Sequence, residues 1–192
     1  MQKPNGYDDV KVGGDYTPPE VGGHTCVIKQ LKETTSKTGK PMVIIYYDFD
    51  EIDSQAGYFA ESFRSDIRPE KKWPYAGTAW IVTETADGQC SKKFKRFVNA
   101  FEKSNGCTVS WGKSFEGQFK NKKIGAVFGK VESEYDGRVS WRNEMRWFCE
   151  YDKAQGADIP DPLPLDGSSS SSGTPAGFTN VPQGMADEDL PF

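Results

Sequence analysis

The sequence predicts a mainly β domain with one inserted α-helix and a C-terminal tail that does not fold. Runs of β-branched and aromatic residues alternate with turn residues between positions 25 and 151, as in short paired strands. One run has the periodicity of a helix instead. Residues 156–192 are rich in Pro, Gly and Ser, so they bury too little apolar surface to fold. A chain of 192 residues fits one principal domain.

The clearest strands form a hairpin at positions 25–49. Segments 25–32 and 42–49 are rich in β-branched and aromatic residues, and they flank the turn residues 36–41. Further strands are predicted at 57–63, 78–83, 124–132 and 139–151. Turn residues 135–138 join the last two of these, which predicts a second hairpin.

The inserted helix is predicted from four apolar residues that recur at i, i+3, i+4 and i+7. These residues are Phe94, Phe97, Val98 and Phe101. Ser91 is placed as the N-cap, and Asn105-Gly106 marks the end. We expect the three phenylalanine rings of the helix to lie in the core. Five or six short strands with one internal helix suit an OB-type Greek-key barrel.

The chain divides into four regions. We expect a flexible arm at 1–20, the barrel at 21–155, a disordered linker at 156–186 and an acidic tip at 187–192. All 24 Lys and Arg residues precede position 156, together with 22 of the 28 acidic residues, so the tail is strongly acidic. No stretch approaches the roughly 18 apolar residues of a membrane helix, and residues 1–6 hold no apolar run. We therefore expect a soluble, cytoplasmic protein that does not contact membranes.

The four cysteines predict no disulfide framework. They are Cys26, Cys90, Cys107 and Cys149, which lie far apart and form no CxxC pair. We expect buried, reduced thiols. His24 stands near Cys26, but no second pair lies at the spacing of a zinc finger, so a buried imidazole or a loop residue is favoured over a metal ligand. No metal or cofactor is predicted.

A basic and aromatic segment extends from Ser91 to Lys130. It holds ten basic residues and only two acidic ones, which predicts contact with a polyanion. Aromatic residues lie among the basic ones, and single-stranded nucleic acid needs both, because bases stack on rings while cations neutralise phosphates. A solvated helix face would look the same. The residues of this segment that we expect to bind single-stranded nucleic acid are Lys92, Lys93, Arg96, Trp111, Lys113, Lys122 and Lys123.

Further candidates flank the two hairpins. In an OB barrel the first hairpin loop and the loop between the last two strands border the binding groove. Strict alternation in the last strand places Trp141, Asn143, Met145 and Trp147 on one face, and it places Arg142, Glu144 and Arg146 on the other. Tyr46 and Tyr47 divide between two faces in the same way. The candidates from these regions are Lys32, Lys37, Lys40, Tyr46, Trp141, Arg142, Arg146 and Trp147.

The last six residues are the most specific signal in the sequence. Three acidic residues precede an apolar end with a free carboxylate, which suits a short linear peptide that seats its last side chain in a pocket with a basic rim. The Ser-rich linker would hold this tip away from the barrel. The predicted partner-binding residues are Asp187, Glu188, Asp189, Leu190, Pro191 and Phe192.

The tip resembles the acidic C-terminus of bacterial single-stranded-DNA-binding proteins, which end in aspartates, an apolar residue, Pro and Phe. The body is similar to a phage-encoded group of such proteins, through 36–41 before a strand and through 115–125 leading into 131–137. The resemblance implies an OB fold, binding of single-stranded DNA without sequence preference, and recruitment of replication, recombination or repair proteins by the tip. Further copies of the chain would be partners in a homo-oligomer. The preference for DNA over RNA rests on the resemblance alone.

Two alternatives belong to other functional classes. Asp48, Asp50, Glu51 and Asp53 follow the second predicted strand, and carboxylates there can hold Mg²⁺ for phosphodiester cleavage, as in a nuclease. No accompanying Lys motif, P-loop, HExxH or GxSxG occurs in the sequence. A recombination adaptor without tight DNA binding would not need the basic segment. The sequence therefore favours a non-enzymatic protein that coats single strands.

Overall fold

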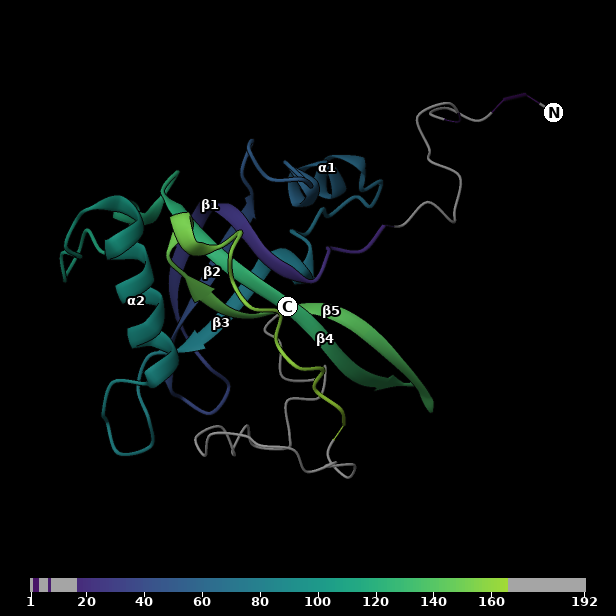
Figure 1. The fold of residues 1–192 in the computed structure, drawn as a ribbon. Coiled ribbons are helices and arrows are strands. Elements are labelled where there is room, and N and C mark those ends of the chain that lie inside the picture. The colour runs from purple at the N-terminus through teal and green to yellow at the C-terminus, as the bar shows by residue number, and fades with distance from the viewer. Residues whose placement is uncertain (1, 4–6, 8–16, 166–192) are drawn as a thin grey trace.

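The computed structural model describes residues 2, 3, 7 and 17–165 (Figure 1). Five antiparallel strands form one sheet in the order β3-β2-β1-β4-β5. The strands are β1 (Gly22–Thr35), β2 (Pro41–Phe49), β3 (Thr78–Val82), β4 (Lys123–Tyr135) and β5 (Arg138–Cys149). Within the described residues β3 and β5 do not pair with each other, so the sheet is open. The mainly β fold with five strands is confirmed.

Two α-helices and three short 3-10 helices join the strands. The α-helices are α1 (Tyr58–Ser65) and α2 (Lys92–Asn105). The 3-10 helices are Tyr75–Gly77, Glu116–Phe119 and Tyr151–Lys153. Figure 1 shows α1 and α2 at different ends of the sheet. The described part of the chain contains no helix that is long and apolar enough to span a membrane.

The hairpin of β1 and β2 has the predicted position. Its loop closes through a hydrogen bond from the Gly39 amide to the Ser36 carbonyl oxygen at 2.8 Å. Gly39 has φ 78°, a conformation that strains residues with a Cβ. The register of β1 against β2 shifts between Ile28 and Gln30, so the intervening residue forms a β-bulge. This bulge increases the local twist of β1 where the strand crosses the middle of the sheet.

The predicted inserted helix is confirmed as α2. The Ser91 hydroxyl oxygen accepts the Phe94 amide at 3.1 Å, and Gly106 ends the helix with φ 58°. Phe97 and Phe101 are fully buried, and the Phe97 ring centre lies 5.3 Å from that of Phe148 on β5. The apolar face of α2 therefore packs against the sheet, as the periodicity predicts.

The strand predicted at 57–63 is wrong, because this segment forms α1. Gly57 has φ 69°, which interrupts an extended chain. The Asp48 carboxylate on β2 then accepts the Phe59 amide at 2.9 Å, which satisfies a backbone donor in the first turn of the helix. Phe59 is the buried residue of α1 and anchors it to the core. A carboxylate distant in the sequence thus stabilises the helical conformation.

The hairpin of β4 and β5 extends beyond the rest of the sheet (Figure 1). Asp136 and Gly137 have φ 52° and 69°, so they form the predicted turn. A register shift pairs Trp147 with Val127 but Met145 with Phe128. Trp147 and Met145 therefore lie on opposite faces, and the prediction that they share a face is wrong. A β-bulge at position 146 interrupts the alternation.

The first part of the predicted linker packs against β4. The Leu163 amide donates to the Lys130 carbonyl oxygen at 2.9 Å, and the Glu132 amide donates to the Leu163 carbonyl oxygen at 2.8 Å. Pro160 covers Gly129, where a Cβ would lie 2.4 Å from the proline ring. Residues 159–165 thus follow the part of β4 that β1 does not cover. Residues 166–186 lie outside the described residues, as do most of residues 1–16.

All four cysteines are free thiols, as predicted. Cys26 is fully buried and Cys149 is half-buried. Cys90 and Cys107 are exposed, so the prediction that all four are buried is wrong. The two exposed thiols lie in the loops directly before and after α2, where no second layer of the fold covers them.

Candidate nucleic-acid interface

A groove of about 1010 Å³ crosses the outer face of β1, β2 and β3. Neighbouring side chains of a strand point to opposite faces. In β2, Ile45 and Tyr47 are therefore buried in the core, while Ile44 and Tyr46 face the groove. Ile44 pairs with Trp80 of β3, which lies on the same face and also lines the groove. The sheet thus supplies an apolar and aromatic floor.

The wall of the groove comes from α1 and the segment that leads to β3. The Tyr75 ring centre lies 4.8 Å from that of Trp80, and the two planes are tilted by 33°. Phe63 and Trp73 form a second ring pair, with centres 5.6 Å apart. The Trp73 indole nitrogen donates to the Gly77 carbonyl oxygen at 3.0 Å, which holds this ring in place. Aromatic side chains therefore line both the floor and the wall of the groove.

Cations outnumber acids among the groove residues. The basic residues that line it are Lys29, Arg68, Lys71 and Lys72. Among the described residues, Asp66 is the only acid in the lining, and it accepts hydrogen bonds from the Arg68 guanidinium at 2.6 and 2.9 Å. These hydrogen bonds hold the pKa of Asp66 at about 2, so it stays ionised. The Lys32 ammonium adds a further cation, 5.8 Å from the Tyr46 ring centre.

This arrangement has the chemistry of a single-strand binding site. Each unpaired base that stacks on an aromatic ring gains about 1–3 kcal/mol, whatever its identity. Lysine and arginine side chains neutralise the phosphates that connect such bases. Bases of a duplex are stacked and paired with each other, so they cannot lie flat on rings in a groove. The groove therefore suits an extended strand better than a double helix.

Two of the predicted nucleic-acid ligands lie at the groove. Tyr46 lines it and Lys32 stands beside Tyr46, whereas Tyr47 is a core residue whose hydroxyl donates to the Ala76 carbonyl oxygen at 2.7 Å. The other aromatic and basic residues of the groove were not predicted from the sequence. They are Lys29, Phe63, Arg68, Lys71, Lys72, Trp73, Tyr75 and Trp80. Two signals could have found them: the basic and aromatic run at 68–75, and the alternation in 78–82 that turns Trp80 outward.

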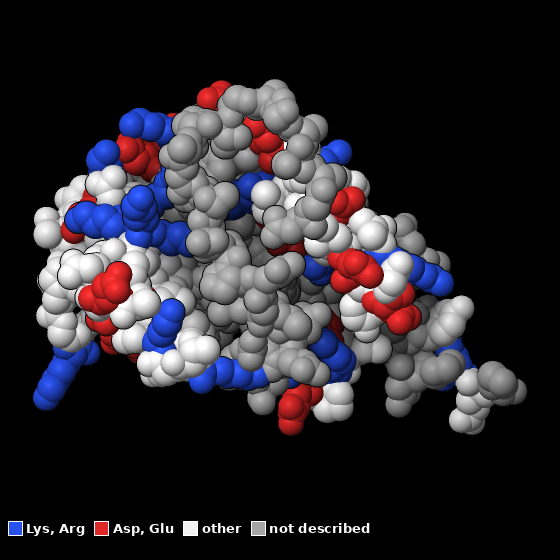
Figure 2. Space-filling model, turned by 90° about the horizontal axis from the view of Figure 1, so that it is seen from below, with Lys and Arg blue, Asp and Glu red and all other residues white. Residues whose placement is uncertain are grey.

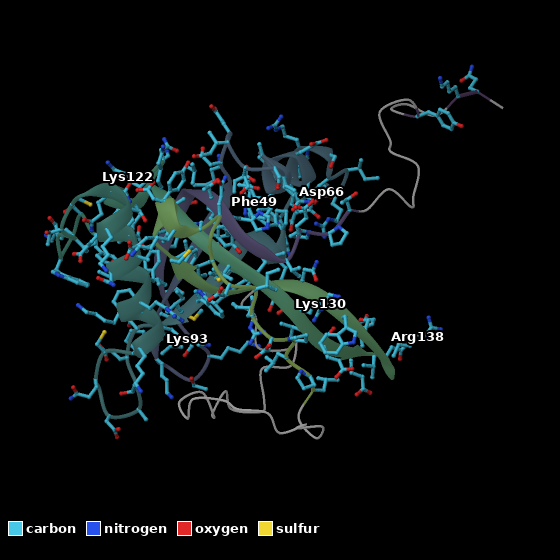
Figure 3. The ribbon with its side chains drawn as sticks, in the orientation of Figure 1. Phe49, Asp66, Lys93, Lys122, Lys130 and Arg138 are labelled. Carbon is cyan, nitrogen blue, oxygen red and sulfur yellow. The ribbon has the colours of Figure 1, made fainter. Side chains whose placement is uncertain are left out.

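The basic residues predicted around α2 form a different surface. Lys92 and Lys93 are exposed in the first turn of α2. Figure 3 shows Lys93 and Lys122 near opposite ends of the helix, with Arg138 far away at the tip of the β4–β5 hairpin. In Figure 2, Lys and Arg side chains gather on the left, the side on which α2 lies in Figure 1, with acidic side chains between them. None of these residues lines the groove.

Two cations of this surface contact aromatic rings of the protein itself. The Arg96 guanidinium lies 5.2 Å from the Trp147 ring centre, and the Lys123 ammonium lies 4.7 Å from that of Tyr151. Such contacts are worth about 0.5–1 kcal/mol at exposed sites; the first joins α2 to β5, and the second joins β4 to the 3-10 helix at Tyr151–Lys153. Arg96 and Trp147, both predicted ligands, are thus brought together, but away from the groove.

A second hollow, of about 790 Å³, lies between α2, the loop at 107–115 and the loop end of β2. Trp111 and Lys113 line it, as do Phe94 and Val43. The Trp111 side chain is 67% exposed and stacks on Phe115, with ring centres 5.4 Å apart and planes at 16°. The residues of this hollow and those of the groove form two separate sets.

The remaining predicted ligands lie on the two hairpins. Trp141 is 48% exposed, and Arg142 Nε lies 3.4 Å from the Glu144 carboxylate. Arg146 is half-buried; burial lowers its pKa, and its guanidinium donates to the Asp161 carbonyl oxygen at 3.2 Å. Lys37 and Lys40 are exposed at the tip of the first hairpin. None of these five predicted side chains lines either hollow.

Two of the carboxylates predicted as a metal site, Asp48 at the end of β2 and Asp50 after it, bind protein donors. Asp48 is buried and accepts the Phe59 amide, while Asp50 accepts the Tyr151 hydroxyl and Glu51 is exposed. Among the described residues, no three His, Cys, Asp or Glu side chains form a group that could hold a metal ion. Asp48 and Asp50 therefore hold elements of the fold together.

Asp53 forms a buried ion pair with His24, as expected for a buried imidazole. His24 Nδ1 lies 3.0 Å from Asp53 Oδ1, and His24 Nε2 lies 3.0 Å from the Glu20 carbonyl oxygen. The imidazole stacks on Phe49 with ring centres 4.2 Å apart; Figure 3 shows Phe49 within the fold. Asp53 also accepts the Thr25 amide at 2.9 Å. The pair connects β1 to the loop after β2.

The predicted partner-binding residues 187–192 lie outside the described residues. The described residues form two hollows that could hold a ligand, the aromatic groove on β1–β3 and the separate hollow beside α2. Compared with models of protein families and with curated proteins, the sequence matches none of them.

Proposed function

We propose that this chain is a non-enzymatic protein that binds single-stranded DNA without sequence preference, in the groove across β1, β2 and β3. The observation that carries the proposal is the groove itself. It combines the rings of Tyr46, Tyr75 and Trp80 with cations from β1 and from the segment that leads to β3. Stacking on the rings and neutralisation of phosphates are both independent of base identity. The strand would therefore be coated whatever its sequence.

The topology supports an OB-type barrel. The central strand β1 pairs with both β2 and β4, and α2 is inserted between β3 and β4. An OB fold is a five-stranded, partly open Greek-key barrel that binds oligonucleotides on the face of its second and third strands. The groove lies on that face of this sheet. Fold topology and side-chain chemistry thus favour the same surface.

The sequence resemblance supports the cellular role. The acidic tip at 187–192 and the motifs at 36–41 and 115–137 resemble single-stranded-DNA-binding proteins of bacteria and phages. We propose that the chain coats exposed strands during phage DNA replication, recombination or repair in the host cytoplasm. Its tip would recruit partner proteins to those strands.

A binding titration tests the proposal. The anisotropy of a fluorescein-labelled oligo(dT) is followed as full-length protein is added, with duplex DNA of the same length as the control. Trp80→Ala removes a ring from the groove and should weaken oligo(dT) binding about 5- to 150-fold, from the loss of about 1–3 kcal/mol of stacking. Trp111→Ala removes an exposed ring outside the groove and should leave affinity within about twofold.

The outcomes separate the functional classes. Tight binding of oligo(dT), weak binding of duplex DNA and a loss only in Trp80→Ala support the proposal. No binding by wild type would leave the adaptor alternative. Cleavage of the oligonucleotide that requires added Mg²⁺ would support a nuclease instead. Equal losses in the two tryptophan variants would place the strand over a wider surface than the groove.

A further inference from the structure

The hairpin of β4 and β5 carries an unpaired strand edge. β5 is the last strand of the sheet, and among the described residues it pairs only with β4. Figure 1 shows the hairpin extending beyond the other strands, and Figure 3 shows Arg138 at its tip. The half of β5 near the tip, residues 138–144, precedes the bulge at 146 and contains no proline. Its outer edge is therefore a regular strand edge that a further strand could pair with.

The pairing of β4 shows which residues of β5 turn their backbone groups to this edge. In an antiparallel pair, opposite residues either exchange hydrogen bonds or both turn their N–H and C=O groups away from each other. Lys130 and Glu132 bind Leu163 with these groups, on the side of β4 away from β5. Their partners on β5, Asn143 and Trp141, must therefore turn the same groups to the outer edge. The residue two positions before Trp141 does so by alternation, and no backbone hydrogen bond within the described residues reaches these outward groups.

Exposed apolar side chains accompany the free edge. Val139 is 56% exposed and Trp141 is 48% exposed, and they lie on one face of β5 because they are two residues apart. Tyr135, where β4 ends, is 78% exposed. Aromatic and β-branched residues are typical of strands that pack against neighbouring strands. The tip of the hairpin thus offers both backbone groups and side chains to a further strand.

We propose that two copies of the chain pair through the outer edges of β5, antiparallel, with Trp141 opposite Trp141 of the second copy. In this register Val139 lies opposite Asn143 of the second copy, and the reverse pair lies on the other side of the two-fold axis. All outward groups then exchange hydrogen bonds, about six in total. The two sheets become one continuous sheet. The proposal goes beyond DNA binding, because it concerns a surface outside the groove.

The charges of β5 select this register. The face of β5 opposite to Trp141 carries Arg138, Arg142 and Glu144. The register places Arg138 opposite Glu144 of the second copy, once at each end of the interface. These are non-hydrogen-bonded pairs, in which side chains approach most closely. A shift by two residues in one direction places Arg142 opposite itself, and in the other direction it places Arg138 opposite Arg142. Both shifts bring like charges together, which is destabilising.

Other registers lose hydrogen bonds. A shift by an odd number of residues sets the outward groups of one strand against the inward groups of the other. A larger shift toward the end of β5 brings the second copy to the bulge at 146, where the regular alternation stops. A larger shift toward the tip leaves fewer residues to pair. The same edge thus supplies both halves of a self-complementary interface, as a two-fold dimer requires, and this favours a second copy over a strand of another protein.

Two charge reversals test the register. Arg138→Glu places a glutamate opposite Glu144, and Glu144→Arg places an arginine opposite Arg138. Each repulsion occurs twice, so each variant alone should associate about 10- to 100-fold more weakly than wild type. An equimolar mixture of the two variants should restore the dimer, because opposite charges then face each other at both ends. Sedimentation velocity of the full chain, over a range of protein concentrations and without DNA, measures the association.

Lys40→Glu is the matched control, because Lys40 is an exposed cation at the tip of the first hairpin. It changes the net charge as much as Arg138→Glu does and should associate like wild type. Each of these variants should bind a short oligo(dT) within about twofold of wild type, since neither Arg138 nor Glu144 lines the groove. Conversely, Trp80→Ala should still form the dimer, so a failure of the interface and a failure of DNA binding are distinguishable.

Four results would overturn the proposal. A wild type that is monomeric at every concentration would leave the edge of β5 to a strand of another protein. Single variants that associate as strongly as wild type would place the contact between copies elsewhere. A mixture that stays as weakly associated as its components would show that Arg138 and Glu144 do not face each other. Species larger than a dimer would show an interface that does not close on itself.

Discussion

His24 shows how one side chain connects three parts of the chain. Both ring nitrogens face acceptors, the Asp53 carboxylate and the Glu20 carbonyl oxygen, so the geometry favours the doubly protonated imidazolium. Burial alone would lower the pKa of His24, but the hydrogen bonds to these acceptors and the charge of Asp53 raise it above its ordinary value. Burial would raise the pKa of Asp53, and the hydrogen bond from His24 lowers it.

These shifts predict a pH dependence of folding. His24 is the only histidine, and its pKa is higher in the folded than in the unfolded chain. Its contribution to stability is thus fully present below an unfolded pKa of about 6.5 and is lost as the pH rises through the folded pKa. Asp53 shows the opposite behaviour: its contribution is present above a pKa of about 3.9 and is lost as the pH falls further.

The measurement is urea unfolding of wild type and His24→Gln between pH 5 and pH 8. Wild type should lose stability above about pH 6.5, while His24→Gln should be less stable at pH 6 by about 1–3 kcal/mol and nearly independent of pH in this range. If the unfolding free energies of the two proteins change with pH in the same way, protonation of His24 does not contribute to the pH dependence of stability.

At the scale of elements, the sequence predicts those helices and strands whose formation depends on residues within the same segment. The helix α2 was predicted with both ends, because its apolar period, Ser91 and Gly106 all lie within the segment. The helix α1 was missed, because it depends on Asp48, a residue of another element. The position of Trp147 on the face of β5 opposite to Met145 was missed for a similar reason, since only the pairing of β5 with β4 shows the bulge.

The dependence of α1 on Asp48 is itself testable. Asp48→Ala removes the acceptor of the Phe59 amide at 2.9 Å and of the Phe49 amide at 3.0 Å. Leaving buried donors without a partner costs about 1–3 kcal/mol each, so we expect unfolding to become easier by at least about 2 kcal/mol. Urea unfolding followed by circular dichroism measures this loss.

The matched control is Asp87→Ala, in the exposed loop before α2, which should change stability by less than about 0.5 kcal/mol. Asp48→Ala should also weaken oligo(dT) binding, because α1 carries part of the groove wall. If Asp48→Ala unfolds no more easily than Asp87→Ala, the carboxylate is not what holds α1 in place.

At the scale of the whole molecule, the groove exists only because distant segments meet. Its floor comes from β1, β2 and β3, and its wall comes from the 28 residues inserted between β2 and β3. Tyr46 and Lys32 could be predicted because they lie in a clear hairpin. The other predicted ligands were mostly the cations around α2, since charge density along the chain does not show which side chains share a surface. Lys29, Lys71 and Trp80 come together only in the folded protein.

The salt dependence of binding tests which cations contact the strand. Each phosphate neutralised on single-stranded DNA contributes about −0.7 to the slope of log K against log salt concentration. Four cations line the groove, so a strand that contacts all of them should give a slope of roughly −3. Lys71→Ala removes one of these contacts and should make the slope less steep by about 0.7.

Lys93→Ala is the comparison, because Lys93 is an exposed cation of α2 outside the groove. Both variants lower the net charge equally, so a general effect of charge would change the two slopes alike. A site confined to the groove predicts that only Lys71→Ala changes the slope, because counterions are released where phosphates are bound. A reduced slope in Lys93→Ala would mean that the strand continues from the groove over α2, and it would return the predicted basic segment to the DNA-binding surface.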